Sequence, residues 1–442
     1  MKKKKLLSLF LTCSMILTML VGCNSDSTDT STKGGSSKSG DQTISLMFWD
    51  DLNTTQDKMS LQYKKYIDEF NAADNGYHIE VTSAALSNNE YDTKLNAAIA
   101  AKKTPDIFFV NPGPTMTKFV KSDVVMDLTD ILSKEAEWKS KFQEGVFDSL
   151  TYDGKIMAVP LNFATACVFY NTEIFKEVGI QAPTTWSEFM DNCSKIKAAG
   201  YSPLTCSGVD AWCIGILGAY LCDREGGPDN LAAVLDGSGS WTDDSYIRAG
   251  KKLKDLADNG YFQDTFLGDA NDQATANFYN GKAAMLVQGS WAIAQINGNH
   301  PEAEDTTGVF TFPALEGGTG DANRWIAKTD NICIAKDCKV VDGCIEFLKL
   351  LTSDAAQKET AENAGKVPVM NGIDIDYDKA PKQFKYITDA MANMSGTLGF
   401  YNESVPTTEI GDEYNNAILA IASGQKTPEQ AFADLDEFYK AK

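Results

Sequence analysis

The chain has 442 residues, with 40 Lys and Arg against 61 Asp and Glu, which gives a formal net charge of −21. This acidic balance argues against nucleic acid as a partner, because phosphate binding needs clustered basic side chains. Only two histidines are present, His78 and His300, which excludes a site of three imidazoles and disfavours a Ser-His-Asp enzyme. The length allows a large core and more than one domain.

The N-terminus has the features of an export signal. Four lysines at 2–5 precede an apolar run at 6–19, which is too short for a comfortable membrane span. The run ends in Leu-Val-Gly-Cys at 20–23, which resembles the box at which bacterial lipoproteins are cleaved and lipidated. We therefore expect residues 1–22 to be a lipoprotein signal peptide and Cys23 to carry two acyl chains, enough for stable anchoring. The alternative is a plain secretory signal with an incidental cysteine.

Residues 23–40 have the composition of a tether. From 24 to 40 the chain contains Ser, Thr, Gly, Asp and two lysines, without a large apolar residue. Such a segment cannot bury enough surface to offset the entropy that ordering would cost. We expect a disordered tether between the lipid and the folded body.

The body begins with alternating strands and helices. The pattern predicts strands at 43–49, 77–83 and 106–110, with helices at 55–73 and 92–102 between them. This β-α-β-α-β order predicts a parallel sheet with right-handed crossovers.

Helix signals and strands recur along the rest of the chain. Thr185 with Glu188 predicts one capping box, and Thr427-Pro428 with Gln430 predicts another at a terminal helix. Further strands are predicted at 166–170, 283–288, 309–312 and 331–335. The sequence shows no internal repeat and, within the body, no linker as flexible as the tether.

Enzyme motifs are absent from the sequence. It contains no G-x-S-x-G, Walker A, G-x-G-x-x-G, C-x-x-C or H-E-x-x-H. The acids at 374, 376 and 378 imitate a calcium loop, but Lys379 replaces its turn glycine, which favours a solvated acidic loop. Asp50 and Asp51 could form a glycosidase pair, yet neighbours at a strand end point to opposite sides. We expect no enzymatic activity, no cofactor and no metal site.

The body retains eight of the ten cysteines after Cys13 in the signal and Cys23 are set aside. They include two groups, one at 206, 213 and 222 and one at 333, 338 and 344. Export permits disulfides, but no spacing requires them. Their apolar surroundings favour buried free thiols, and the pairing stays open.

Five segments, taken in order, resemble the extracellular solute-binding proteins of carbohydrate ABC transporters, the maltose-binding-like family. The most specific is Asn-Gly-Lys-Ala-Ala-Met at 280–285, which leads to Gly-Ser-Trp at 289–291. The others are TPDIF at 104–108, the stretch 170–189 from YNTEIF to PTTWSEF, GV with FP at 308–313, and GKVP at 365–368. The resemblance covers essentially the whole body.

This resemblance implies the type II periplasmic-binding-protein fold: two α/β lobes joined by a multi-strand hinge, with the ligand cleft between them. By analogy the chain crosses between the lobes near Phe163, near 325–329 and near 367–370. Lobe 1 would comprise 41–163 and 328–368, and lobe 2 would comprise 164–327 and 369–442.

A sugar site needs a flat aromatic ring for the apolar face of a pyranose and planar amides or carboxylates for its hydroxyls. Ligands bind at strand ends in open α/β sheets, and several residues of these types occupy such positions. Trp291 aligns with a position that stacks sugar in the family. We therefore predict ten ligand-binding residues: Trp49, Asp50, Asn111, Asn162, Asp210, Trp212, Trp291, Arg324, Trp325 and Lys366.

Structural roles stay open for several of these. Strand alternation could turn Trp49 inward, and Trp212 begins an apolar run that could bury it. Asn111 precedes a proline and could serve turn chemistry, while Lys366 could be exposed.

The resulting hypothesis is a monomeric, lipid-anchored protein on the extracytoplasmic face of a Gram-positive cytoplasmic membrane. It would capture a sugar or oligosaccharide and deliver it to the membrane subunits of an ABC transporter. Two alternatives stay open: a binding protein of the same fold for a polyamine or peptide, and a secreted carbohydrate-active enzyme.

Overall fold

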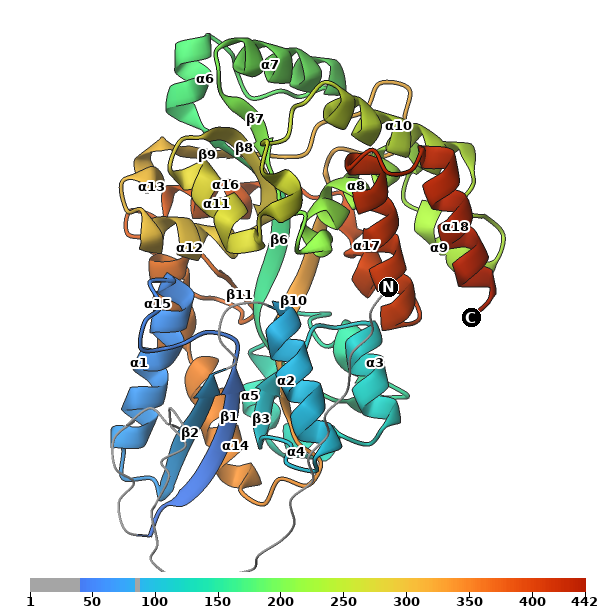
Figure 1. Ribbon diagram of the computed structural model, residues 1–442. Coiled ribbons are helices and arrows are strands. Elements are labelled where there is room, and N and C mark those ends of the chain that lie inside the picture. The colour runs from blue at the N-terminus through green and yellow to red at the C-terminus, as the bar shows by residue number, and fades with distance from the viewer. Residues whose placement is uncertain (1–39, 84–87) are drawn as a thin grey trace, which may run out of the picture. The chain divides into compact units, whose positions relative to one another are not determined.

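The computed structural model describes residues 40–83 and 88–442 (Figure 1). The expected signal peptide, lipidation at Cys23 and all but the last residue of the expected tether lie outside the described residues. The residues that are described belong to one compact unit. None of their helices combines the length and apolar character that a membrane span requires.

A parallel sheet forms the first part of the body. Strand β1 (Gln42–Phe48) lies between β2 (Tyr77–Ser83) and β3 (Ile107–Phe109) and runs parallel to both. The Asp106 carboxylate accepts hydrogen bonds from the Ser45 backbone N–H (2.8 Å) and hydroxyl (2.6 Å), which fixes the start of β3 beside β1. The predicted parallel sheet is therefore confirmed.

Helices on this sheet complete what we call lobe 1, the elements around the first buried cluster. Asp57 caps helix α1 through the Ser60 N–H, and α1 buries a face that includes Tyr63, Ile67 and Phe70. The helices and short strands of this lobe are α1 (Lys58–Ala72), α2 (Asn88–Ala100), α3 (Pro114–Lys121), α4 (Thr129–Lys134), α5 (Ala136–Ser140), η1 (Asp148–Leu150), β4 (Thr151–Tyr152), β5 (Lys155–Ile156), α14 (Val341–Leu351) and α15 (Asp354–Ala364).

Three strands connect lobe 1 to the rest of the body. They are β6 (Val159–Asn171), β10 (Arg324–Ile334) and β11 (Val367–Pro368). Phe163 of β6 pairs with Thr329 of β10 on one side and with Val367 of β11 on the other, in both cases antiparallel. Long strands that serve both lobes make a stiff connection rather than a loose linker, as Figure 1 shows for β6 and β10.

Lobe 2 comprises the elements around the second buried cluster. Its strands are β7 (Ser202–Thr205), β8 (Ala283–Gly289), β9 (Thr307–Phe310) and β12 (Gly396–Leu398). Its helices are α6 (Thr172–Val178), α7 (Trp186–Ala198), α8 (Ala211–Gly226), α9 (Asn230–Asp236), α10 (Asp244–Asp258), η2 (Phe266–Gly268), α11 (Asn271–Tyr279), α12 (Ala292–Asn299), α13 (Ala303–Thr306), α16 (Lys382–Met391), η3 (Tyr401–Glu403), α17 (Thr408–Ala422) and α18 (Pro428–Lys440).

Both predicted capping boxes are present. Thr185 and Glu188 cap α7 reciprocally, and Thr427 with Gln430 does the same for α18. These local signals were readable because a capping box is satisfied within four consecutive residues.

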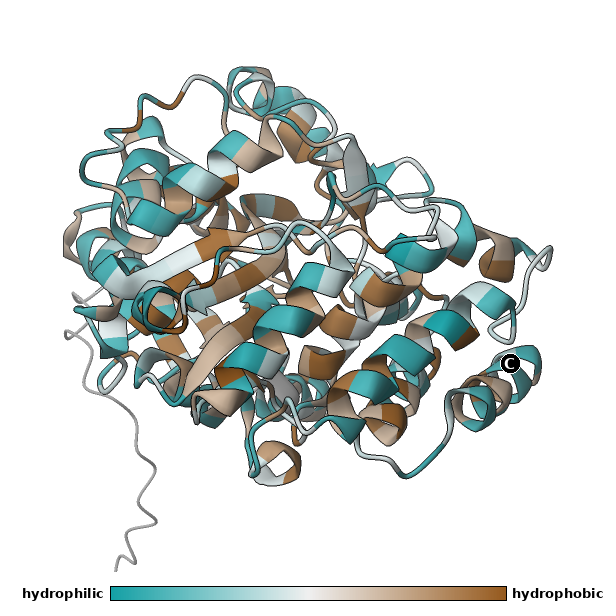
Figure 2. Cartoon of the chain, turned by 90° about the horizontal axis from the view of Figure 1, so that it is seen from above, coloured by the Kyte–Doolittle hydropathy of each residue, from teal (hydrophilic) through white to brown (hydrophobic). Residues whose placement is uncertain are grey.

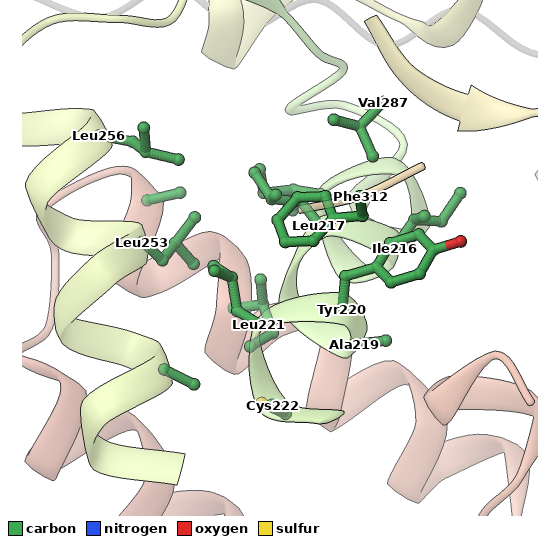
Figure 3. Packing of buried hydrophobic residues seen from close by; sticks show 14 of the residues in the cluster. Ile216, Leu217, Ala219, Tyr220, Leu221, Cys222, Leu253, Leu256, Val287 and Phe312 are labelled. Carbon is green, nitrogen blue, oxygen red and sulfur yellow. The ribbon is translucent and has the colours of Figure 1, made fainter. Parts of the chain in front are cut away.

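The buried hydrophobic residues form two large clusters, one in each lobe. In lobe 2 the apolar helix α8 packs on α10, with Leu217 and Leu221 near Leu253, and Tyr220 stacks on Phe312 with ring centroids 5.0 Å apart (Figure 3). Coloured by hydropathy, the outer helices carry hydrophilic and hydrophobic residues on different faces (Figure 2). Each lobe thus has its own core, which allows the two to move as units.

Candidate ligand-binding site

The connecting strand β10 presents two charged side chains on one face. Lys328 and Asp330 are two residues apart, so strand alternation turns them the same way. Lys328 contacts predicted site residues toward lobe 2, and Asp330 contacts others at the junction of β6 and β11. The candidate site is built around these two residues.

An aromatic group from lobe 2 lies beside Lys328. Trp291 follows strand β8 and meets Trp212 edge-on at 5.9 Å between centroids, with Phe400 6.0 Å away on a third segment. The Lys328 ammonium lies 5.9 Å from the Trp291 ring and 4.8 Å from the Phe400 ring. Trp291 and Trp212 are half-buried, so each retains exposed ring surface.

Gly289 makes room for the Trp291 ring. A β carbon at this glycine would lie 2.2 Å from two ring atoms of Trp291, closer than any real contact. The predicted Gly-Ser-Trp turn therefore sets the position of the indole, because only a residue without a side chain fits beneath it.

Lys328 also joins the two lobes. Its Nζ lies 3.0 Å from Asn111 Oδ1, after strand β3 of lobe 1, and 2.7 Å from Glu403 Oε1, in η3 of lobe 2. The side chains of Lys328 and Glu403 are 11% and 17% exposed, so solvent screens this ion pair only in part.

A second polar group lies where the connecting strands meet. Asn162 Nδ2 donates to Asp330 Oδ2 at 2.7 Å, and Lys366 Nζ donates to the same oxygen at 3.2 Å. Lys366 is buried, with 4% of its surface exposed, and its ion pair with Asp330 offsets part of the cost of taking the ammonium group out of water. Asn162 and Lys366, both predicted as site residues, thus lie side by side on the Asp330 carboxylate.

Trp49 and Asp50 follow strand β1 on the lobe 1 side. Trp49 is half-buried against Phe109 and Tyr63, with centroids 4.5 and 5.5 Å away. Asp50 accepts hydrogen bonds from the Thr55 hydroxyl and the Asp51 N–H. Burial raises the pKa of nearby Asp57, an effect that Lys366 opposes and Asp50 reinforces, so these charges lie close together.

Asp210 has a positioning role in lobe 2. It is 4% exposed and accepts from the Asn271 N–H at 2.8 Å, while its own N–H donates to the Ser207 hydroxyl. These bonds tie the start of α8, and hence Trp212, to the start of α11. Asp210 thus fixes the first turn of α8, which carries Trp212.

The structure does not bring Arg324 and Trp325 to this group. Trp325 is 1% exposed and packs in a lobe 2 cluster with Phe169 and Leu286, so it offers no free ring face. Arg324 Nη1 pairs with the buried Asp223 at 2.6 Å, and Asp223 also pairs with buried Arg224. Both residues belong to a part of β10 that is enclosed within lobe 2, and we leave them out of the site.

An Arg324→Ala variant separates these roles. It removes one charge-assisted hydrogen bond from the buried Asp223 carboxylate, so we expect unfolding free energy to fall by about 1.5–3 kcal/mol. Ligand affinity should stay unchanged, because Arg324 does not touch the aromatic group. Chemical denaturation and titration calorimetry measure the two effects. A loss of affinity without a loss of stability would return Arg324 to the site.

Sequence reasoning missed Lys328, Asp330, Phe400 and Glu403. The first two carried a usable signal, since they are two residues apart at a predicted crossing near 325–329, where an extended chain would turn both to the same side. Phe400 precedes the single-turn helix η3 and Glu403 ends it, and so short an element leaves no periodic pattern in the sequence. Only the tertiary fold places them against residues that are far away in the sequence.

The charges around the site are mostly negative. Burial of the carboxyl group raises the pKa of Asp92 to about 6, and Glu403 and Asp412 add to this effect while Lys328 opposes it. Burial also raises the pKa of Asp272, and the negative charges of Asp50 in lobe 1 and Asp210 in lobe 2 raise it further. Across the residues described, no group of three or more His, Cys, Asp or Glu side chains could hold a metal ion.

Three polar atoms of the candidate site are buried without a hydrogen-bond partner among the described residues. They are Trp212 Nε1, Glu403 Oε2 and Asn162 Oδ1, one donor and two acceptors. Buried polar atoms are normally paired, so these three have capacity to bind a polar ligand once the lobes separate. The arrangement suits binding through stacking and hydroxyl contacts.

Comparison with known proteins gives a family. The family model for bacterial extracellular solute-binding proteins matches residues 55–358. The sn-glycerol-3-phosphate-binding periplasmic protein of Yersinia enterocolitica is 25% identical over 421 residues, covering 87% of this chain and 89% of that protein. The multiple sugar-binding protein of Streptococcus mutans is 23% identical over 361 residues, 80% of each chain.

Solved structures give the same fold. A protein from a study of xylan utilization by Caldanaerobius polysaccharolyticus aligns with a TM-score of 0.82 at 25% identity, covering 90% of this chain and 100% of that one. A chitin oligosaccharide binding protein aligns with a TM-score of 0.80 at 25% identity, covering 90% and 98%. The expected type II periplasmic-binding-protein fold is confirmed.

Proposed function

Because the chain belongs to the bacterial extracellular solute-binding proteins, which act outside the cytoplasm, we propose that it captures a neutral oligosaccharide between its two lobes. The observation that carries this proposal is the Trp212, Trp291 and Phe400 group, together with three polar atoms of the site that have no hydrogen-bond partner among the described residues. Aromatic faces take the C–H face of a pyranose, and the polar atoms take its hydroxyls. The same ligand class is supported by the aligned structures, which include a chitin oligosaccharide binding protein and a protein from a study of xylan utilization.

The charges favour a neutral ligand over a phosphorylated one. The two lysines of the site, Lys328 and Lys366, are already paired with Glu403 and Asp330. A phosphate would have to replace these carboxylates and would meet further acids at Asp50 and Asp92. We therefore assign the chain a different ligand from the glycerol-3-phosphate named for its Yersinia relative.

Capture rests on movement of the lobes. We assign 41–163 with 328–368 to lobe 1 and 164–327 with 369–442 to lobe 2, hinged on the strands at Phe163. Ligand contacts to both lobes stabilise the closed form by binding it more tightly than the open form. The closed protein, a monomer held to the membrane through lipid on Cys23, then delivers the sugar to an ABC transporter.

A calorimetric panel tests the ligand class. Xylo-, chito- and malto-oligosaccharides are titrated alongside sn-glycerol-3-phosphate and spermidine. We expect at least one neutral oligosaccharide to bind with micromolar or tighter affinity, and the phosphate to give no binding heat. Binding of glycerol-3-phosphate alone would overturn the proposal.

A polyamine is the second candidate, because the acids around the site, among them Asp50, Asp92 and Asp272, would attract a polycation. Spermidine binding without oligosaccharide binding would support it. Turnover of labelled oligosaccharide by the pure protein would instead show an enzyme, which the paired states of Asp50 and Asp51 disfavour.

Closure should depend on pH through Asp92. Its pKa of about 6 lies above that of a free carboxyl group. The closed form therefore holds a proton that Asp92 would release once the lobes move apart. Protonation thus favours closure, and this contribution is lost as pH rises through 6. The carboxyl group of Asp92 is packed among other groups, but the residue as a whole keeps an exposed surface. Solvent therefore screens part of the effect, and we expect affinity to fall only a few-fold between pH 5 and 7. Calorimetry on Asp92→Asn should show a flatter profile, and an identical profile would exclude Asp92 as the source.

A further inference from the structure

Two cysteines lie in contact at the base of lobe 1. Cys338 Sγ is 3.7 Å from Cys344 Sγ, and all eight cysteines of the described body are free. For comparison, the sulfur recorded nearest to Cys333 is that of Met116, which cannot form a disulfide. The 338–344 pair is therefore the one for which the structure records a direct contact between thiols.

Backbone bonds hold both cysteines in place. Cys338 closes a turn after β10, where its N–H donates to the carbonyl oxygen of Ala335 (3.1 Å). Cys344 lies in the first turn of α14, and its N–H donates to the carbonyl oxygen of Val340 (3.1 Å). The same turn is held to lobe 1 by a second hydrogen bond, in which the Ala335 N–H donates to the Asp106 carbonyl oxygen (2.8 Å). These bonds fix both backbone segments, so the approach of the sulfurs from 3.7 Å to a bonded distance of about 2 Å would have to come from the two side chains.

The turn also allows access from solvent. Cys338 is 8% exposed, but Lys336, Asp337 and Lys339 beside it are exposed, whereas Cys344 is fully buried. The hydrogen bond between the two thiols lowers the pKa of Cys338, which makes Cys338 the better nucleophile of the pair. Outside the cytoplasm, oxidising conditions allow disulfides to persist.

We propose that Cys338 and Cys344 form a disulfide that ties the end of the connecting strand β10 to helix α14. The Cys338 thiolate attacks an external organic disulfide and releases one thiolate from it. The Cys344 thiolate then attacks Cys338 Sγ and releases the second. The two cysteines lose two protons and two electrons, and the external disulfide is reduced to two thiols.

The proposed bond is independent of ligand capture. The cysteines lie beyond Ile334, the last residue of β10, whereas the site is built on Lys328 and Asp330 nearer its middle. The bond closes a loop at 338–344 in the unfolded chain and so lowers the entropy of the unfolded state. It should therefore raise the free energy of unfolding of lobe 1. It should leave ligand affinity unchanged. Peptide mapping therefore tests the disulfide, and calorimetry tests ligand capture, independently of each other.

Peptide mapping tests the bond on the full chain. The protein is incubated with oxidised glutathione, free thiols are alkylated in denaturant, and trypsin is added without reductant. Cleavage after Lys336, Lys339 and Lys349 puts the two cysteines on separate peptides, 337–339 and 340–349. We expect these two peptides to remain joined by a disulfide and to separate on reduction.

Two variants complete the test. Cys338→Ser should lose the joined peptide and the higher midpoint of thermal unfolding that oxidation gives the wild-type chain. Cys193→Ser, which removes a buried thiol of α7 in lobe 2, should keep both. The proposal is overturned if oxidation yields no joined peptide, links other cysteines instead, or leaves only a glutathione adduct on Cys338.

Discussion

Replacing Trp291 with Ala should weaken oligosaccharide binding by about 1–3 kcal/mol, roughly 5- to 150-fold in the dissociation constant. The indole is half-buried between Trp212 and Phe400, so its loss removes both a stacking face and the wall that orients Trp212. Calorimetry measures the affinity, and thermal unfolding shows whether the fold survives. A Trp291→Phe variant, which keeps a smaller ring, should bind with intermediate affinity.

Tyr377→Ala is the matched control for this experiment. Tyr377 is an aromatic residue with 44% of its surface exposed, and its recorded contacts are with Phe384 and Lys385, away from the site. Its removal should leave affinity unchanged. If Trp291→Ala and Tyr377→Ala bind oligosaccharide equally well, Trp291 is not part of the site.

The second large effect comes from a glycine that touches no part of the proposed site. Gly298 in α12 of lobe 2 lies against the chain before α1 of lobe 1, and a β carbon there would be 1.9 Å from Gln56 O. A Gly298→Ala variant therefore cannot close as this structure does. We expect a shift toward the open form and an affinity about tenfold lower or worse, since only the closed fraction binds tightly.

A second glycine, Gly113, lies at another point where the two lobes touch. A β carbon on Gly113 of lobe 1 would lie 1.9 Å from Glu403 O of lobe 2. Gly113 has a φ of +87°, so alanine also strains the backbone, and Gly154→Ala supplies the control. Gly154 has a φ of +78° with nothing within 4 Å, so it carries the strain without the clash.

The paired design separates closure from folding. Gly268, which has no left-handed φ and nothing within 4 Å, is the control for Gly298. Small-angle scattering should give a larger radius of gyration for Gly298→Ala and Gly113→Ala than for their controls when ligand is present. Equal radii and equal affinities would show that these contacts do not govern closure.

Local elements were predictable wherever the signal was contained in a few residues. The strand at 77–83 matches β2, and both capping boxes are present. The helix expected at 92–102 instead spans Asn88–Ala100, because no cap marks its start in the sequence. Strand β10 begins earlier than the predicted 331–335, since its first half is completed by pairing with β6 and β12.

The candidate site was predictable only in part. Residue type and strand-end position indicated Trp291, Trp212, Asn111, Asn162 and Lys366, which the structure groups around β10. The same reasoning also selected Trp325, because residue type and position along the chain do not show that this end of β10 is packed inside lobe 2, where the ring is buried. Phe400 and Glu403 needed the tertiary structure.

The most direct test of the central claim is a crystal structure of the protein grown with the tightest-binding oligosaccharide from the panel. We predict a pyranose ring stacked on Trp291 between the two lobes, with its hydroxyls bonded by Trp212 Nε1, Asn162 Oδ1 or Glu403 Oε2. A saccharide bound elsewhere on the surface, or a cleft occupied by a ligand that is not a saccharide, would contradict the account.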